Sequence, residues 1–168
     1  YWKKSVIYYL IGKGMWKIMD EKKYEVFCSI MNEMDRAYDL MKEYDSLPHH
    51  YGDYVLYQAE SHMIEHIGMN EGVTITKLAE ELGKTRSACC QMVRKLRNKK
   101  WVEQIRNERN NREYNLYLTG EGKRIFKNHA EFDLRCYKRN FEGLAQFGYE
   151  DLEKYLEIQK KINKSFQK

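Results

Sequence analysis

The sequence predicts a mainly α-helical fold with one small β-hairpin, and three observations support this prediction. Proline occurs once, at Pro48, and glycine ten times in 168 residues, so long uninterrupted helices are permitted. Hydrophobic residues make up 42% of the chain, which is enough apolar material for a packed core. Apolar residues recur at helical spacing over long stretches, whereas clear alternation is confined to the segments 101–106 and 113–118.

The cysteines and the apolar runs indicate the compartment. The four cysteines include the adjacent pair Cys89 and Cys90 and have neither disulfide-framework nor zinc-pair spacing, so a reducing cytosol fits best. The longest uncharged apolar run near the N-terminus, Val6–Ile11, is far shorter than the ~20 residues of a membrane span and than a secretory signal. We therefore expect a cytoplasmic protein without a membrane segment. Because Met19 is a more natural beginning than Tyr1, we treat residues 1–18 as an N-terminal extension of uncertain status.

Two helices are predicted in the first part of the chain. The first covers residues 22–45, and its apolar residues form an a/d seam over about three heptads. These seam residues are Tyr24, Phe27, Met31, Met34, Tyr38 and Met41. Such a seam packs either within the chain or against a partner, and the sequence leaves both open. After a break at Pro48, a second helix is expected from Asp53, as N-cap, to Ile67, with Gly68 ending it.

Residues 73–99 have the pattern of a helix-turn-helix. A short stretch, Val73–Ile75, precedes a helix that starts at Thr76 as its cap and ends at Gly83. A three-residue turn then leads into a helix over residues 86–99 with a basic outer face. Its inner face is expected to contain Cys89, Val93 and Leu96.

The remaining elements are a hairpin and two helices. Segments 101–106 and 113–118 are joined by a polar stretch and predict the hairpin. A long helix follows to about Gly143, and a last helix begins near Glu150. Their inner faces are expected to contain Ile125, Phe126, His129, Phe132, Cys136 and Tyr137, and then Leu152, Tyr155, Leu156, Ile162 and Phe166.

The net charge of +5 is concentrated in one segment of the chain. Residues 84–112 hold ten Lys and Arg against Glu103 and Glu108, which gives +8, whereas the other 139 residues sum to −3. An ordinary soluble surface intersperses its charges. A mildly acidic body with one basic patch is instead typical of a nucleic-acid-binding protein.

Several short motifs follow one another in a fixed order. They are Thr-Lys-Leu-Ala-Glu-Glu-Leu-Gly (76–83), Thr-Arg-Ser-Ala-Cys-Cys-Gln-Met-Val-Arg-Lys-Leu (85–96), Trp-Val-Glu (101–103), Asn-Asn-Arg (110–112) and Leu-Thr-Gly-Glu-Gly (118–122). In order and spacing they resemble the winged helix-turn-helix of the MarR family of transcriptional regulators. The flanking helices fall where that family has its dimerisation helices. The resemblance therefore implies a single MarR-like domain over 19–168, with a DNA-binding lobe at about 53–122 and dimerisation helices at about 22–45 and 121–168.

The chain departs from the family pattern at three positions. The wing of the family usually carries Asp-x-Arg, whereas this chain has Asn110 with Arg112 retained. Lys100 replaces the glycine that normally closes the recognition helix, so either a left-handed cap there costs more or the bend is made differently. Cys90 stands at a DNA-facing position where small hydroxylic residues are more usual. These departures bear on affinity and sequence preference rather than on the fold.

The candidate DNA-binding residues lie in the recognition helix and the wing. Those of the helix are Thr85, Arg86, Ser87, Cys90, Gln91 and Arg94. Arginine reads guanine and glutamine reads adenine in the major groove, so these types suit base recognition. Arg109 and Arg112 are expected to enter the minor groove or to bind phosphate at the wing tip. Contact with phosphate or solvent alone is the alternative for Arg86 and Arg94, and a solvated tip is the alternative for the wing.

The resemblance also implies partners and a signal. Members of the family interleave their end helices across a two-fold axis, which implies a homodimer that binds a pseudo-palindromic double-stranded operator. A monomer with helices folded on its own core is the alternative. A repressor role is most common in the family, and a small phenolic or aromatic effector often binds between the dimer helices and the DNA lobes.

Metal and redox sensing are less favoured interpretations, and no cofactor is expected. His62 and His66 are four residues apart on one helical face and are the candidate metal ligands, but packed or solvated histidines are more common. Cys28 in the first helix and Cys90 are the candidate redox residues. A buried free cysteine that acts as a small apolar residue is the more common case.

The sequence contains no enzyme signature. It has no Gly-x-Ser-x-Gly elbow, P-loop or Rossmann fingerprint, and its histidines pair with no recognisable nucleophile. The leading hypothesis is a DNA-binding regulator that responds to a small molecule or to redox change. The alternative is a winged-helix module that binds nucleic acid or protein without an effector response.

Overall fold

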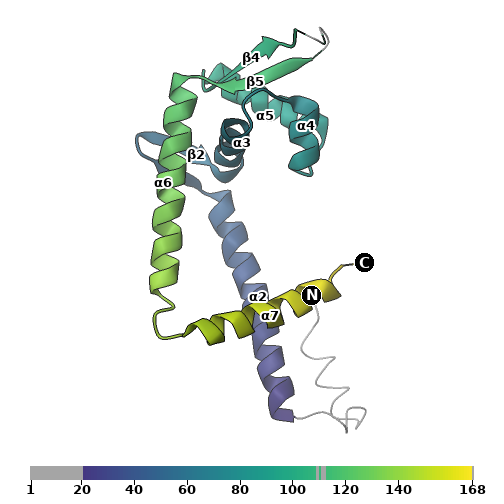
Figure 1. Ribbon diagram of the computed structural model, residues 1–168, viewed down its shortest axis with the longest axis vertical. Coiled ribbons are helices and arrows are strands. Elements are labelled where there is room, and N and C mark those ends of the chain that lie inside the picture. Colours follow the sequence, from purple (N-terminus) through teal and green to yellow (C-terminus); the bar gives the residue numbers. More distant parts are fainter. Residues whose placement is uncertain (1–20, 109, 111–112, 168) are drawn as a thin grey trace. The chain divides into compact units, whose positions relative to one another are not determined.

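The computed structural model describes residues 21–108, 110 and 113–167, and it has the predicted mainly α architecture with a small hairpin (Figure 1). In chain order the elements are α2 (Glu21–Ser46), β1 (Pro48–Tyr51), β2 (Tyr54–Tyr57), α3 (Gln58–Met69), β3 (Val73–Thr74), α4 (Ile75–Glu81), α5 (Arg86–Asn98), β4 (Val102–Arg106), β5 (Tyr114–Leu118), α6 (Gly120–Glu142) and α7 (Tyr149–Ser165). The chain divides into two compact units, residues 1–47 and 48–168.

In the first unit, α2 confirms the long helix predicted over residues 22–45. Several of its large apolar side chains remain in contact with solvent. Val26, Tyr38, Leu40 and Met41 each expose more than half of their surface, at 61, 67, 55 and 66%. Apolar side chains exposed to this extent on a long helix are typical of a surface that packs on another element, within the chain or in a partner.

The second unit begins with a hairpin where the sequence predicted a helix from Asp53. Strands β1 and β2 pair antiparallel, with Pro48 opposite Tyr57 and Tyr51 opposite Tyr54. Gly52 makes the turn with φ +63°, a conformation that glycine adopts without strain. The aromatic and β-branched side chains of 54–57 favour a strand, and the side chains of Tyr51 and Leu56 are fully buried.

Helix α3 therefore starts later and ends later than predicted. Its first turn is capped by Glu60, whose Oε2 accepts a hydrogen bond from the Tyr57 amide at 3.1 Å. The helix continues through Gly68 to Met69, and Asn70 is the C-cap, with its amide bonded to the carbonyls of His66 and Ile67. The predictions that Asp53 caps this helix and that Gly68 ends it are wrong.

The helix-turn-helix has the predicted order with one shifted cap. Thr74, not Thr76, caps α4, because its hydroxyl accepts a hydrogen bond from the Lys77 amide. Gly83 ends this helix with φ +59°. Thr85 then caps α5, since its hydroxyl accepts from the Ala88 amide at 3.2 Å.

The predicted hairpin is confirmed as β4 and β5, which belong to a three-stranded sheet with the order β3-β5-β4. Val102 pairs with Leu118 and Arg106 with Tyr114. Strand β3 adds two residues on the other side of β5, with Val73 opposite Leu116. The sheet thus connects the start of the helix-turn-helix to its wing.

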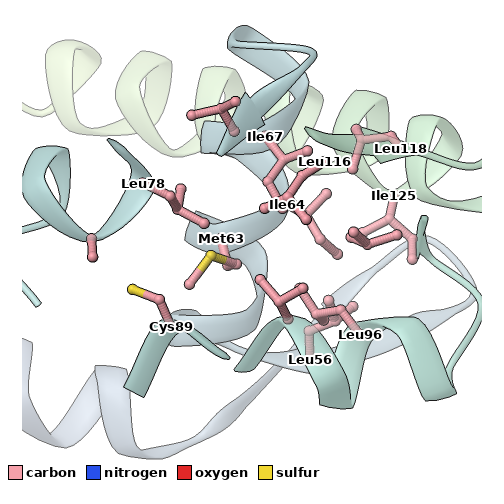
Figure 2. Close-up of a cluster of buried hydrophobic side chains, with 14 of the residues drawn as sticks. Leu56, Met63, Ile64, Ile67, Leu78, Cys89, Leu96, Leu116, Leu118 and Ile125 are labelled. Atoms are coloured by element: carbon pink, nitrogen blue, oxygen red, sulfur yellow. The ribbon is translucent and has the colours of Figure 1, made fainter. Parts of the chain in front are cut away.

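The core of the second unit surrounds α3 (Figure 2). Met63, Ile64 and Ile67 point from α3 towards side chains of α4, α5, β5 and α6. The residues that close around them are Leu56, Leu78, Cys89, Val93, Leu96, Leu116, Leu118 and Ile125. The prediction that Cys89, Val93 and Leu96 form the inner face of the second helix is confirmed, because all three are at most 1% exposed.

Helix α6 leaves this core towards its C-terminal end. Ile125 and His129 are buried as predicted, and Phe126 and Phe132 pack partly against the core. Tyr137 is 75% exposed within the protomer, so its predicted place on the inner face is wrong for a single chain. Helix α7 has no buried residue, so the prediction of an inner face with Leu152, Tyr155, Leu156, Ile162 and Phe166 is also wrong for a single chain. No helix in the described part of the chain is long and apolar enough to span a membrane.

Candidate nucleic-acid interface

Helix α5 is held by one face and leaves the other face open. Its inner side packs on α3 through Cys89, Val93 and Leu96, and Thr85 fixes the direction of its first turn. Residues one, four, five and eight positions after Arg86 lie on the same side of a helix as Arg86, opposite the buried side. The residues on this open face are Arg86, Ser87, Cys90, Gln91 and Arg94, and each of them is exposed.

Thr85 has a structural role at this surface. It is exposed, but its hydroxyl oxygen is engaged as the α5 cap. The hydroxyl proton remains available for a phosphate oxygen or a base. Thr85 therefore lies next to the open face, although its structural role is to cap the N-terminus of α5.

The wing is formed by β4 and β5, and its candidate arginines, Arg109 and Arg112, lie outside the described residues. Near the tip, Asn107 organises the turn, since its side-chain oxygen accepts from the Asn110 amide at 3.1 Å. Its side-chain nitrogen donates to Asn115 Oδ1 at 3.1 Å. The Asn110 carbonyl in turn accepts from the Glu113 amide at 2.9 Å. Asn110, the residue that departs from the family pattern, is therefore bonded through its backbone to a turn built on Asn107.

A basic cavity of about 640 Å³ lies beside the open face of α5. Its charged lining consists of Arg94, Arg97 and Lys100 against Glu103, and Cys90 also borders it. Arg97 donates from Nη1 to Gln104 Oε1 at 2.6 Å, which links α5 to β4. A cavity with an excess of positive charge next to an exposed polar helix suits a phosphate backbone.

Lys100 turns the chain from α5 into β4. It adopts φ +61°, the left-handed conformation that the missing glycine would take without strain. Its carbonyl accepts a hydrogen bond from the Thr119 hydroxyl at 2.7 Å, at the start of α6. Of the two alternatives for Lys100, the structure shows the left-handed turn rather than a bend made differently.

A buried carboxylate anchors the C-terminal half of α5. Glu60 is 1% exposed, and its Oε1 lies 2.7 Å from Lys99 Nζ and 3.0 Å from Lys95 Nζ. Burial by itself raises the pKa of Glu60, but hydrogen bonds from Lys99, Lys95 and the Tyr57 amide outweigh it and hold the pKa below its ordinary value. The Lys95 side chain is half exposed, so it has both this internal partner and contact with solvent.

We expect Glu60→Gln to lower the free energy of unfolding by about 1–3 kcal/mol at pH 7, because the buried site loses charged hydrogen bonds. The folded pKa of Glu60 lies below the value of 4.5 that an unperturbed carboxyl has. The advantage of the wild type is therefore complete above that value and disappears as the pH falls through the lowered pKa. Urea unfolding at several pH values measures this difference. Glu80→Gln, at an exposed pair with Lys77, should change stability little at any pH.

The cysteines differ in their environment. Cys89 is buried in the core, and burial raises the pKa of its thiol. Cys90, one of the two redox candidates, is exposed on the open face of α5, and Cys28, the other, is partly exposed on α2. All four cysteines have free thiols in this structure. A redox role for Cys28 or Cys90 stays a prediction.

The two histidines singled out in the sequence do not come together. His66 Nε2 is hydrogen-bonded to Glu81 Oε2 of α4 at 2.5 Å. His62 instead lies close to Glu65 of α3 and His129 of α6. Burial lowers the pKa of His129 below its ordinary value, against the opposing effects of Asp133 and Glu65. Sequence spacing did not reveal this group, because His129 lies more than sixty residues beyond Glu65.

Comparisons with known proteins match this architecture. A family model described as MarR family matches residues 57–113. No curated protein matches the chain significantly. The solved structure of Streptococcus pneumoniae FabT in complex with DNA is 20% identical, with a TM-score of 0.63 over 86% of this chain and 99% of FabT.

Two structures of Lactococcus lactis ZitR are also similar. One, described as a zinc-responsive MarR family member, is 14% identical, with a TM-score of 0.72 over 84% of this chain and 99% of its own. The other, ZitR in complex with DNA, is 19% identical, with a TM-score of 0.67 over 82% and 97% of the two chains. At sequence identities this low, the similarity to these structures establishes the fold of this chain and not its function. Residues 57–113 thus carry the MarR family pattern, as the sequence predicted, and the chain around them has the winged-helix fold of MarR-family proteins.

Proposed function

We propose that this chain is a transcriptional regulator that binds specific sequences of double-stranded DNA. The observation that carries the proposal is the open face of α5, where two arginines and a glutamine are exposed opposite a fully buried apolar face. The basic cavity beside Arg94 adds positive charge along the same surface. That FabT and ZitR of the same fold have been solved in complex with DNA supports the proposal.

In this proposal α5 enters the major groove. Arg86, Gln91 and Arg94 have the donor and acceptor groups that read guanine and adenine edges, and Ser87 and Cys90 are small enough to allow close approach. Thr85 and the basic groups of the cavity contact phosphates and set the register. Arg109 and Arg112 of the wing would add contacts in the adjacent minor groove.

Fluorescence anisotropy tests this function directly. The purified chain is titrated with a labelled duplex from upstream of its own gene and with a scrambled duplex of equal length, over a series of salt concentrations. We expect a preference of at least ~10³-fold for the native duplex and a steep loss of affinity with salt. Equal affinity for both duplexes would favour the alternative of a non-specific winged-helix module. Absence of binding at low salt would overturn the proposal.

We further propose that the chain acts as a homodimer. Helix α6 exposes three large side chains at spacings of three and four, with Leu134 at 69%, Tyr137 at 75% and Phe141 at 71%. Side chains at this spacing form one apolar face. Helices α2 and α7 also expose apolar side chains, including Met41 and Tyr155. A second copy of the chain is the partner that covers such faces in a two-fold arrangement.

We expect the double substitution Leu134→Glu and Phe141→Glu to convert the dimer to a monomer, because two charges would be buried in an apolar interface. Light scattering coupled to size-exclusion chromatography measures the mass. Arg139→Glu changes charge on the opposite side of α6 and should leave the dimer intact. A wild-type chain that elutes as a monomer at micromolar concentration would contradict the homodimer.

Repression and effector response are the finer parts of the proposal. A dimer on a promoter blocks polymerase, and an effector that favours a different spacing of the two α5 helices lowers affinity for the operator. A small phenolic or aromatic compound or oxidation of a cysteine would provide the signal. SlyA, another solved structure of this fold, is described as a transcriptional regulator, which supports a role other than catalysis. Such a regulator works in the compartment that holds the DNA.

A further inference from the structure

A group of metal-ligating side chains lies where α3 packs on α6. His62 and Glu65 are one turn apart on α3, and His129 comes from α6. Each residue offers one ligand atom, and these three atoms all lie within 4.8 Å of one another. This group is separate from the open face of α5.

His129 is the fixed member of this group. Its side chain is 2% exposed, and its Nε2 is buried without a hydrogen-bond partner among the residues that the structure describes. An unsatisfied buried nitrogen is costly, by roughly 1–3 kcal/mol, and is rare in native proteins. A ligand for this nitrogen would remove that cost.

The surroundings of His129 orient it as a metal ligand. Its Nδ1 lies 3.4 Å from Asp133 Oδ2, one turn further along α6, which favours the proton on Nδ1 and leaves the lone pair on Nε2. The ring is packed 5.0 Å from the ring of Tyr51 and lies 6.0 Å from the ring of His62. A carboxylate behind a histidine is the usual outer partner of a metal-bound imidazole.

We propose that His62, Glu65 and His129 form a binding site for a divalent first-row transition metal ion, with Zn²⁺ as the expected occupant. Two imidazole nitrogens and one carboxylate oxygen suit zinc better than calcium or magnesium, which prefer all-oxygen sites. Three protein ligands leave one tetrahedral position for water or a further ligand. The proposal does not depend on the proposed DNA binding.

The geometry requires only small adjustments for an ion to bind. Ligand atoms in a tetrahedral zinc site are about 3.3 Å apart, given bonds of about 2.0–2.1 Å. His62 is exposed and Glu65 is half-buried, so both can move towards the fixed Nε2 of His129. Gln58 Nε2 donates to His62 Nε2 at 2.8 Å, so an ion that binds His62 either replaces this hydrogen bond at Nε2 or requires the ring proton to move from Nδ1 to Nε2.

Metal titration of the full chain tests the site. The metal-free protein is titrated with Zn²⁺ against a chromophoric chelator, and with Co²⁺ while its visible absorption is recorded. His62→Gln and Glu65→Gln, at positions outside the core, should each lower Zn²⁺ affinity at least about tenfold and abolish the absorption of tetrahedral Co²⁺. His66→Gln, on the same helix but paired with Glu81, should keep both signals.

Two further variants separate an effect on Zn²⁺ binding from an effect on folding. Asp133→Asn should weaken Zn²⁺ binding while leaving the circular dichroism spectrum unchanged, because it removes only the orienting carboxylate. His129→Gln removes the buried ligand, and if it unfolds the chain, the His62 and Glu65 variants still decide. The site is overturned if wild type, His62→Gln and Glu65→Gln bind Zn²⁺ equally, or if wild type gives no tetrahedral Co²⁺ absorption.

Discussion

Gly122→Ala should lower the free energy of unfolding by at least about 3 kcal/mol, the largest stability effect of a single methyl group that we expect in this chain. A Cβ at this position would lie 2.0 Å from the carbonyl oxygen of Trp101 and 3.2 Å from Leu118 Cβ. The Trp101 carbonyl cannot move freely, because it accepts the Thr119 amide at 3.1 Å. The first turn of α6 therefore packs against the backbone before β4 with no room for a side chain.

Thermal unfolding measures this effect, with Gly120→Ala as the matched control two residues earlier. Nothing lies within 4 Å of a Cβ at Gly120, so alanine there should be neutral or stabilise by up to about 1 kcal/mol. The difference corresponds to a fall in Tm of about 6–12 °C for Gly122→Ala. Equal melting temperatures for the two variants would show that the close contact between α6 and Trp101 is wrong. A lower melting temperature for Gly122→Ala alone would also explain why the Leu-Thr-Gly-Glu-Gly motif ends in glycine.

Arg86→Ala and Arg94→Ala should each weaken binding of the native duplex, and at least one of them by about 1–3 kcal/mol, a loss of about 5- to 150-fold. The physical reason is the loss of a bidentate contact to a base in the major groove. Fluorescence anisotropy on native and scrambled duplexes measures both affinities. A base-reading arginine loses affinity mainly on the native duplex, so the ratio of the two affinities falls.

The control for this prediction is Arg135→Ala, which removes the same charge from an exposed position on α6. It should leave the affinity ratio unchanged. If both α5 variants weaken the native and scrambled duplexes equally and reduce the salt slope by about one, both arginines contact phosphate only. Unchanged binding in both variants would remove the open face of α5 from the proposed interface.

The sequence predicted those elements whose signals are local. The caps and glycines around 83–85, the alternation of 101–106 and 113–118, and the periodic apolar residues of α5 each carry their own information. At Lys100 the missing glycine indicated either a left-handed turn at a cost or a bend made differently, and the structure has the left-handed turn. These signals were sufficient for the winged helix and its open face.

Errors arose where tertiary contacts override local patterns. Val55 and Leu56 fall at helical spacing with the apolar residues of α3, which predicted a helix, but their pairing with β1 places them in a strand. Thr74 and Thr76 are equally good caps by type, and the β3 pairing places Thr74 at the helix start.

The candidate sites show the same limit. Glu60 gave no sign in the sequence that it would lie under α5, because its partners Lys95 and Lys99 are more than thirty residues away. His62 was recognised, but it was paired with the wrong neighbour. The spacing of four residues places His66 on the same face of α3 as His62, whereas the fold brings His129 of α6 close to His62. Long-range packing of α3 on α6 carries this information, and residue spacing within one helix does not.

Hydrogen exchange measured by mass spectrometry, with and without the native duplex, tests the central claim most directly. The claim is that the open face of α5 is a DNA-binding surface. We expect DNA to slow exchange of amides in peptides that cover residues 84–98 and to leave peptides from the middle of α7 unchanged. Protection confined to other elements, or unchanged exchange throughout α5 at saturating DNA, would contradict it.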